Sequence, residues 1–118
     1  MKNFDLEERT TKFAKDVIRL CRTLQNNPIN YRLIGQVVGS SGSVGANYRE
    51  ANDSLGKKDF LLHMRIARRE AKESHHWLDC LMEANPERTD DILPLFNEAD
   101  ELKRILSSII YKTEHPIK

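Results

Sequence analysis

Apolar residues at alternating spacings of three and four recur along this chain, and this spacing constrains the possible folds more than any other feature. Side chains three and four apart lie on one face of an α-helix. In the segment over about 5–25, the spacing is followed by Leu6, Thr10, Phe13, Val17, Leu20 and Leu24. Asn26, Asn27 and Pro28 then interrupt it, because proline disfavours helical conformation in the residue before it. The segment therefore predicts a helix with one buried face and Asp5 as its N-cap.

The same spacing predicts a helix over about 58–84 and another over about 90–113. In the first, the apolar line consists of Phe60, Met64, Ala67, Ala71, Ser74, Leu78 and Leu81. In the second, it consists of Ile92, Leu95 or Phe96, Ala99, Leu102, Leu106, Ile109 and Ile110. An Asn-Pro pair at 85–86 separates the two, and the Thr-Asp-Asp cluster at 89–91 is typical of a helix start. Pro94 fits this helix only within its first turn, where a missing N–H costs little.

The segment over about 30–55 gives conflicting signals. Each of its four glycines costs a helix roughly 1 kcal/mol relative to alanine, which favours a loop or a pair of strands. Its periodicity favours a helix, because three lines of different character run along it. The core line is Ile34, Val37, Ser41, Val44, Tyr48, Ala51 and Leu55. What we term the glycine line is Gly35, Gly39, Gly42 and Ala46, and the polar line is Gln36, Ser40, Ser43, Asn47 and Glu50.

The glycine line needs a packing reason. A helix face without side chains lets another helix approach closely, and the added contact offsets the propensity cost. That neighbour is either another helix of the same chain or a second copy of the protein. We predict that this helix holds the subunit contact, formed by the glycine line together with Ser43, Asn47 and Glu50.

The four segments together predict an all-α fold with a single domain over 1–118. Long helices joined by short connections pack as antiparallel neighbours, so we expect an up-down-up-down four-helix bundle. Hydrophobic residues make up 39% of the chain and charged residues 31%, as in a helical globular protein. Aromatic residues reach only 7%, so we expect a mainly aliphatic core.

Charge and targeting signals narrow the function classes further. The formal net charge is only +1, so any attraction to nucleic acid must come from how charges are arranged. No apolar run approaches the roughly 20 residues that cross a bilayer, and the first residues lack an export signal. We therefore expect a cytoplasmic protein without membrane contact, in which Cys21 and Cys80 are reduced.

No segment carries a recognisable catalytic or cofactor-binding motif. The glycine- and serine-rich stretch over 39–45 lacks the lysine of a phosphate-binding loop. Glu73 and His76 have the spacing of half a di-iron site, but such bundles need two copies of it. His76 and Cys80 could hold zinc only with further ligands, which leaves a metal shared between subunits as an alternative. We predict no enzyme activity, no resident metal and no cofactor.

Two predicted helix faces are basic. The first basic stripe is Lys12, Lys15, Arg19 and Arg22, and the second is Arg65, Arg68, Arg69 and Lys72. One interpretation is ordinary solvated surface, which acidic neighbours such as Asp16 and Glu70 favour. The other is a surface that follows a phosphate backbone, without reading sequence and with strong sensitivity to salt. Self-association would repeat weak stripes and strengthen their combined field.

Three motifs stand out in order along the chain: SVGANYREA over 43–51, KKDF over 57–60 and IARREAKESHHWL over 66–78. Through them the chain resembles the bacterial 23S ribosomal RNA intervening-sequence protein family. The positions that match the family motifs are Ser43, Gly45, Asn47, Glu50, Phe60, Glu70 and Trp77. Gly39 stands where relatives often carry arginine, which removes a charge from that helix. Gly56 stands where a serine often precedes the lysine pair, which weakens a helix cap.

The resemblance implies a four-helix bundle that assembles as a homo-oligomeric ring, usually a pentamer. It also implies genes within intervening sequences of large-subunit ribosomal RNA in some bacteria, and it implies no catalytic residue. A related branch serves as accessory proteins to the reverse transcriptases of diversity-generating retroelements. In that branch the basic bundle surface engages nucleic acid and the transcriptase.

Three functional hypotheses follow. The leading one is a non-enzymatic, ring-forming scaffold that binds RNA or DNA backbone weakly through the two basic stripes. The second is an adaptor for a protein encoded nearby, such as a reverse transcriptase, with no direct contact to nucleic acid. The third is an enzyme with a polar pocket around Ser43, Asn47 and Glu50 at a subunit interface.

Overall fold

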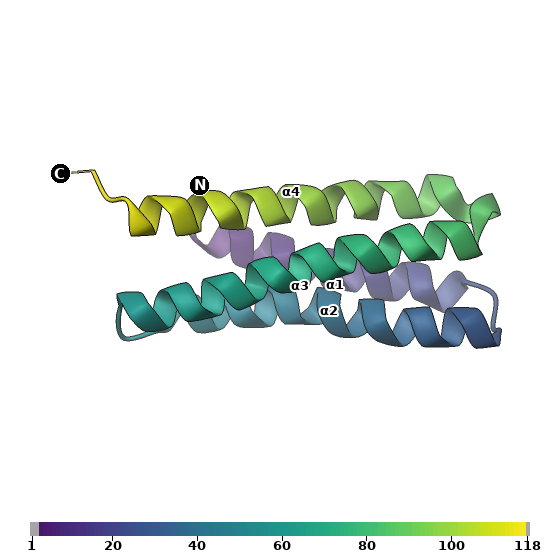
Figure 1. Cartoon of the computed structure of the whole chain (residues 1–118). Helices are drawn as coiled ribbons and strands as arrows, with labels where there is room; N and C mark the ends of the chain where they lie inside the picture. The colour runs from purple at the N-terminus through teal and green to yellow at the C-terminus, as the bar shows by residue number, and fades with distance from the viewer. Residues whose placement is uncertain (1–2, 118) are drawn as a thin grey trace.

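The computed structural model describes residues 3–117 and forms four long helices (Figure 1). They are α1 (Asn3–Thr23), α2 (Pro28–Asn52), α3 (Lys57–Ala84) and α4 (Thr89–Glu114). A single 3-10 turn, η1 (Pro86–Arg88), lies between α3 and α4. Short connections join each helix to the next, and the molecule is elongated, with extents of 52 × 20 × 19 Å.

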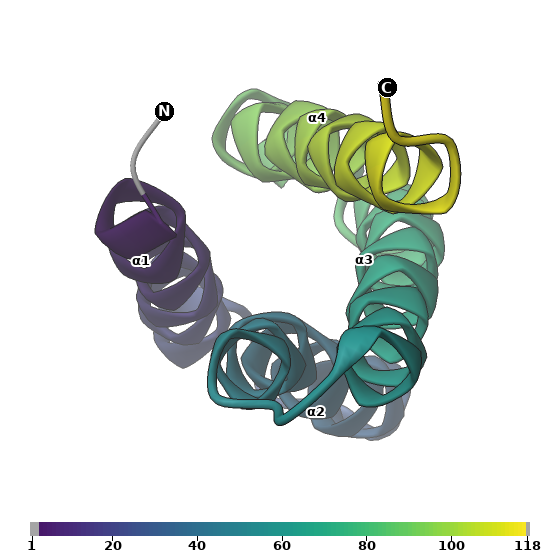
Figure 2. The same ribbon diagram turned by 90° about the vertical axis from the view of Figure 1, so that its left-hand side faces the viewer.

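The helices follow one another around the bundle axis in chain order. Viewed along the axis in Figure 2, α1 lies at the left, α2 at the bottom, α3 at the right and α4 at the top. Helix α1 packs against α2 and α4, and α3 also packs against α2 and α4. Helices α1 and α3 are therefore diagonal to each other. This arrangement confirms the predicted all-α, up-down bundle.

The core is built from the predicted apolar lines. All six residues of the first predicted line are buried, five in α1 and Leu24 just beyond its end, and Thr10 is fully inaccessible. The hydroxyl of Thr10 donates to the carbonyl oxygen of Glu7 at 3.0 Å, so its burial leaves no donor unpaired. Val17, Val44 and Leu102 are among the residues with no exposed surface, and each comes from a different helix. The core is mainly aliphatic, as the composition predicts.

Helix α2 forms despite its glycines, which confirms the prediction from periodicity, but its ends differ from those expected. It begins at Pro28, two residues early, because the Asn27 side chain accepts a hydrogen bond from the backbone N–H of Asn30 at 2.8 Å. It ends at Asn52, so Leu55 lies beyond it and is completely exposed. The assignment of Leu55 to the core line is therefore wrong.

The ends of α1 also differ from those expected, whereas those of α3 and α4 lie within one residue of the prediction. Helix α1 begins at Asn3, so Asp5 lies inside the helix and is not its N-cap. The helix ends at Thr23, and the backbone N–H of Leu24 then donates to the carbonyl oxygen of Cys21. Helix α3 begins after Gly56, which supplies no side-chain cap.

In α4 the prediction that Pro94 lies in the first turn is wrong. The helix begins at Thr89, so Pro94 is its sixth residue. The carbonyl that loses a donor there belongs to Asp90, an exposed residue near the helix start that water can hydrate.

Two buried asparagines fix the end of the bundle where α2 begins. The side-chain amide of Asn30 donates to the side-chain oxygen of Asn85 at 2.9 Å, and Asn85 returns the same bond at 2.9 Å. Each amide nitrogen also donates to a backbone carbonyl, Asn30 to that of Gln25 and Asn85 to that of Leu81. This fully paired network ties the α1–α2 connection to the end of α3.

Over the described residues, every helix falls short of the length and apolar character that a membrane span requires.

Candidate nucleic-acid interface

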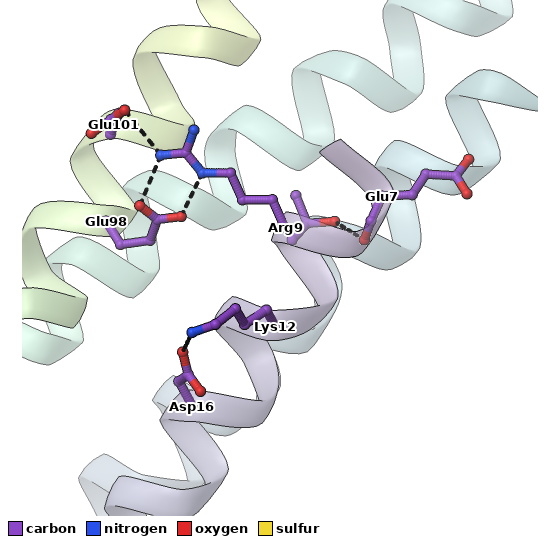
Figure 3. Close-up of polar contacts among 7 residues, drawn as sticks. Glu7, Arg9, Lys12, Asp16, Glu98 and Glu101 are labelled. Carbon is purple, nitrogen blue, oxygen red and sulfur yellow. Dashed lines mark hydrogen bonds and ion pairs between the residues drawn. The ribbon is translucent and has the colours of Figure 1, made fainter. Parts of the chain in front are cut away.

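The first basic stripe lies along α1 and points away from the core. All four of its residues are exposed, while Phe13 and Val17 of the same helix are buried. Asp16 pairs with two of them, at 2.6 Å from Lys12 Nζ and at 2.8 Å from Arg19 Nη1 (Figure 3 shows the Lys12 pair). Among the described side chains, Lys15 and Arg22 form no ion pair. One carboxylate thus offsets four cations, and the stripe keeps a net positive charge.

The orientation of α1 depends on contacts to both neighbouring helices. Towards α4, Arg9 forms a bidentate pair with Glu98, with N–O distances of 2.8 and 2.9 Å (Figure 3). Its Nη2 atom also lies 3.0 Å from Oε1 of Glu101. The bond to Glu98 raises the pKa of Arg9, so the guanidinium stays charged. Towards α2, Arg49 donates to Glu7 at 2.9 Å. We term the Arg9 contacts the α1–α4 clasp.

The second basic stripe lies on α3 at the side that faces α4. Arg65 pairs with Glu114 of α4, and Arg68 is half-buried. Arg69 and Lys72 are exposed and have no ion-pair partner within the described part of the chain. Burial, followed by the negative charge of Glu73, raises the pKa of the neighbouring Glu70 carboxyl. The second stripe is therefore partly engaged within the bundle, unlike the first.

The two stripes do not form one surface in a single chain. They lie on α1 and α3, the two diagonal helices of Figure 2. A straight nucleic-acid backbone could therefore follow one stripe or the other, but not both at once. The sequence could predict each stripe, but not their separation, because that depends on the packing order of the helices.

The glycine line faces away from the other helices. Its four residues are exposed, and a Cβ placed on Gly35, Gly39 or Gly42 would meet no atom within 4 Å. A close neighbour within the same chain, one of the two alternatives for these glycines, is therefore excluded. Gly45 is the exception, because a Cβ there would lie 2.9 Å from the Thr10 hydroxyl of α1. Gly45, which is not part of the glycine line, is therefore the glycine that α2 needs in order to pack against α1.

The polar line divides between the interior and the surface. Ser40 is buried and pairs with Ser74 of α3, whose hydroxyl donates to it at 2.9 Å. Asn47 is half-buried and donates to the backbone carbonyl of Ser43 at 2.9 Å, and Glu50 is exposed. Ser40 therefore has a structural role, while Ser43 and Asn47 are half-buried and Glu50 is exposed on the surface of α2.

The possible metal ligands on α3 lie close to one another. Cys80 Sγ is 3.8 Å from His76 Nε2, one helical turn away. Within residues 3–117, no three side chains of histidine, cysteine, aspartate or glutamate gather in a metal-binding arrangement.

The sequence patterns do not single out Tyr31 and Arg32, two residues near the start of α2 that lie beside the end of the first basic stripe. Together with Arg22 they line a hollow beside the α1–α2 connection. Arg32 belongs to no basic stripe, because α2 has few other charged residues. It lies beside Arg22 only because the fold brings α1 and the start of α2 together.

Comparison with known proteins finds a family model that matches this chain and a solved structure with a similar fold. The family model described as 23S rRNA-intervening sequence protein matches residues 2–108. A crystal structure of a protein with unknown function from the S23 ribosomal protein family of Bacteroides thetaiotaomicron is similar, with a TM-score of 0.84 and 29% sequence identity. The match covers 94% of this chain and 99% of that one. No curated protein matches the chain.

Proposed function

This chain belongs to the 23S rRNA-intervening sequence protein family, and we propose that it is a self-associating helical scaffold that binds the backbone of RNA or DNA without sequence preference. The observation that carries the proposal is the first basic stripe, in which four cations are exposed and a single carboxylate pairs with only two of them. Lysine and arginine along a helix contact successive phosphates and supply affinity without reading bases.

Self-association completes the proposal. Gly35, Gly39 and Gly42 leave a bare strip on the outside of α2, and they lower helix propensity without any packing gain inside the chain. A second copy seated on the part of this strip formed by Gly39 and Gly42 would supply that gain, and a pentameric ring, as the family resemblance implies, would repeat the contact. Repetition would also present several first stripes to one nucleic-acid strand, so weak binding at each would add up.

Binding of labelled RNA measured by fluorescence anisotropy tests this function. Two RNA oligomers of unrelated sequence should bind with similar affinity, and the logarithm of the affinity should fall linearly with the logarithm of salt concentration. The double variant Lys12→Gln/Lys15→Gln removes two phosphate contacts, so its salt slope should be shallower by about 1.5.

The matched control is Arg104→Gln/Lys112→Gln, which removes two exposed cations from α4 and should leave the slope unchanged. Absence of binding at low salt, or affinity that persists unchanged at high salt, would exclude the backbone-binding scaffold. A defined protein that co-purifies with a chain unable to bind RNA would instead support the adaptor.

A further inference from the structure

A hollow of about 680 Å³ lies beside the connection between α1 and α2. Two arginines line it from different helices, Arg22 at the end of the first basic stripe and Arg32 near the start of α2. None of the described residues that line it is acidic, and neither guanidinium forms an ion pair with a described side chain. The volume falls in the range of about 300–1,000 Å³ that is typical of small-molecule sites.

The walls of this hollow are held by hydrogen bonds. Asn30, one of the lining residues, is buried and bonds to the backbone carbonyl of Gln25 at 2.8 Å and to Asn85 at 2.9 Å. The backbone N–H of Tyr31 donates to the carbonyl of Asn27 at 2.9 Å. The backbone on both sides of the hollow is thus fixed before any ligand arrives, which reduces the ordering cost of binding.

Gly35 keeps the hollow open. It lines the space, it is exposed, and a Cβ added to it would meet nothing within 4 Å. A larger side chain at this position could therefore be accommodated by the fold and would project into the space. This gives the first glycine of the line a role that differs from that of Gly39 and Gly42, which do not line the hollow.

We propose that this hollow binds one nucleoside phosphate. Arginine guanidinium groups bind phosphate oxygens through paired N–H donors, and Arg22 and Arg32 supply two such groups. Tyr31 is 78% exposed and lines the same space, so its ring is available to stack on a base. The side-chain amides of Asn26 and Gln36, also in the lining, offer donors and acceptors to the base edge.

The bound nucleotide is a unit of an RNA strand that lies along the first basic stripe. Arg22 belongs both to the stripe and to the lining of the hollow, so a backbone that follows α1 leads into it. This identification of the strand rests on the proposed function, whereas binding of a nucleoside phosphate does not. A free mononucleotide carries the same phosphate and base, so it is the alternative ligand of the hollow.

Isothermal titration calorimetry with adenosine 5′-monophosphate, adenosine and inorganic phosphate tests the site at low salt. The monophosphate should bind at least about tenfold more tightly than either part alone, because phosphate and base contacts act together. Arg32→Gln should weaken it by about tenfold. Gly35→Leu should abolish binding, whereas Gly56→Leu, a matched change at an exposed glycine outside both the hollow and the glycine line, should leave it intact, with circular dichroism confirming that both variants fold.

Equal affinity for the monophosphate and inorganic phosphate, or binding that survives Gly35→Leu, would overturn the proposal. Binding of a short labelled RNA distinguishes an RNA strand from a free mononucleotide as the ligand. If the RNA binds with a steep salt slope but Gly35→Leu and Arg32→Gln bind it as the wild type does, the scaffold function stands and the strand-binding role of the hollow falls. If the mononucleotide binds and the RNA does not, the hollow is a site for free nucleotides and the scaffold function falls.

Discussion

Gly42 and Gly45 lie one turn apart on α2 and have opposite surroundings. Gly42 is exposed and has free space where a side chain would begin, whereas Gly45 is buried against Thr10 of α1. Thr10 is fully buried, is branched at Cβ and has its hydroxyl bonded to Glu7, so it cannot move aside easily. The sequence places Gly42 in the glycine line and Gly45 in none of the three lines, but it does not indicate which of the two packs inside the chain.

This difference predicts stability changes of opposite sign. Gly42→Ala should raise the free energy of unfolding by about 1 kcal/mol, because alanine favours helix and meets no neighbour. Gly45→Ala should lower it by about 1–3 kcal/mol through overpacking against Thr10. Urea unfolding at low protein concentration, where association adds little, measures both. Thr10→Ala in the Gly45→Ala background should recover part of the loss, and equal stability of the two alanine variants would contradict this account.

At the scale of elements, α1 is the helix whose position matters most for the first basic stripe. Its predicted apolar line is buried, and on the α4 side two described polar contacts hold it: the clasp of Arg9 with Glu98 and Glu101, and the bonds from Arg88 of η1 to Thr23 at 2.9 and 3.1 Å. In Figure 2 the ribbon of α1 lies nearer to α2 than to α4. The clasp therefore ties the first half of α1 to α4, and Arg88 ties its end.

Loss of the clasp should loosen α1 without unfolding the bundle. Arg9→Met keeps most of the apolar stem and removes the charge, and should cost about 1 kcal/mol because the pair is partly exposed to solvent. Hydrogen exchange should then accelerate in the first half of α1 and remain unchanged in α3. Arg104→Met, which removes an ion pair within α4, is the control and should leave α1 exchange as it is. Unchanged exchange in α1 of the Arg9 variant would show that apolar packing alone holds the helix.

The sequence predicts existence and type of elements better than their ends. Three-four spacing identified every long helix, including α2, where glycine propensity pointed the other way. The ends depend on local hydrogen bonds that spacing does not reveal, such as the Asn27 cap that moves the start of α2 to Pro28 and the early end that leaves Leu55 exposed.

The candidate site was only partly predictable for a similar reason. The two basic stripes follow from residue spacing within one helix. Their placement on diagonal helices, and the approach of Arg32 to Arg22 beside Gly35, depend on how helices pack.

For the molecule as a whole, we propose that the bundle associates with copies of itself and binds nucleic acid. The bare outer face of α2 and the outward cations of α1 lie on neighbouring helices, so both could act in one assembly. Assembly through α2 would leave the outward face of α1 accessible to a strand.

Light scattering coupled to size-exclusion chromatography, with absorbance recorded at two ultraviolet wavelengths, tests that claim most directly. We expect a mass several times the 13.7 kDa of one chain, accompanied by an absorbance ratio that reveals nucleic acid and falls after a high-salt wash. Gly39→Leu/Gly42→Leu should reduce the mass. A particle of 13.7 kDa with the absorbance of protein alone would contradict the account.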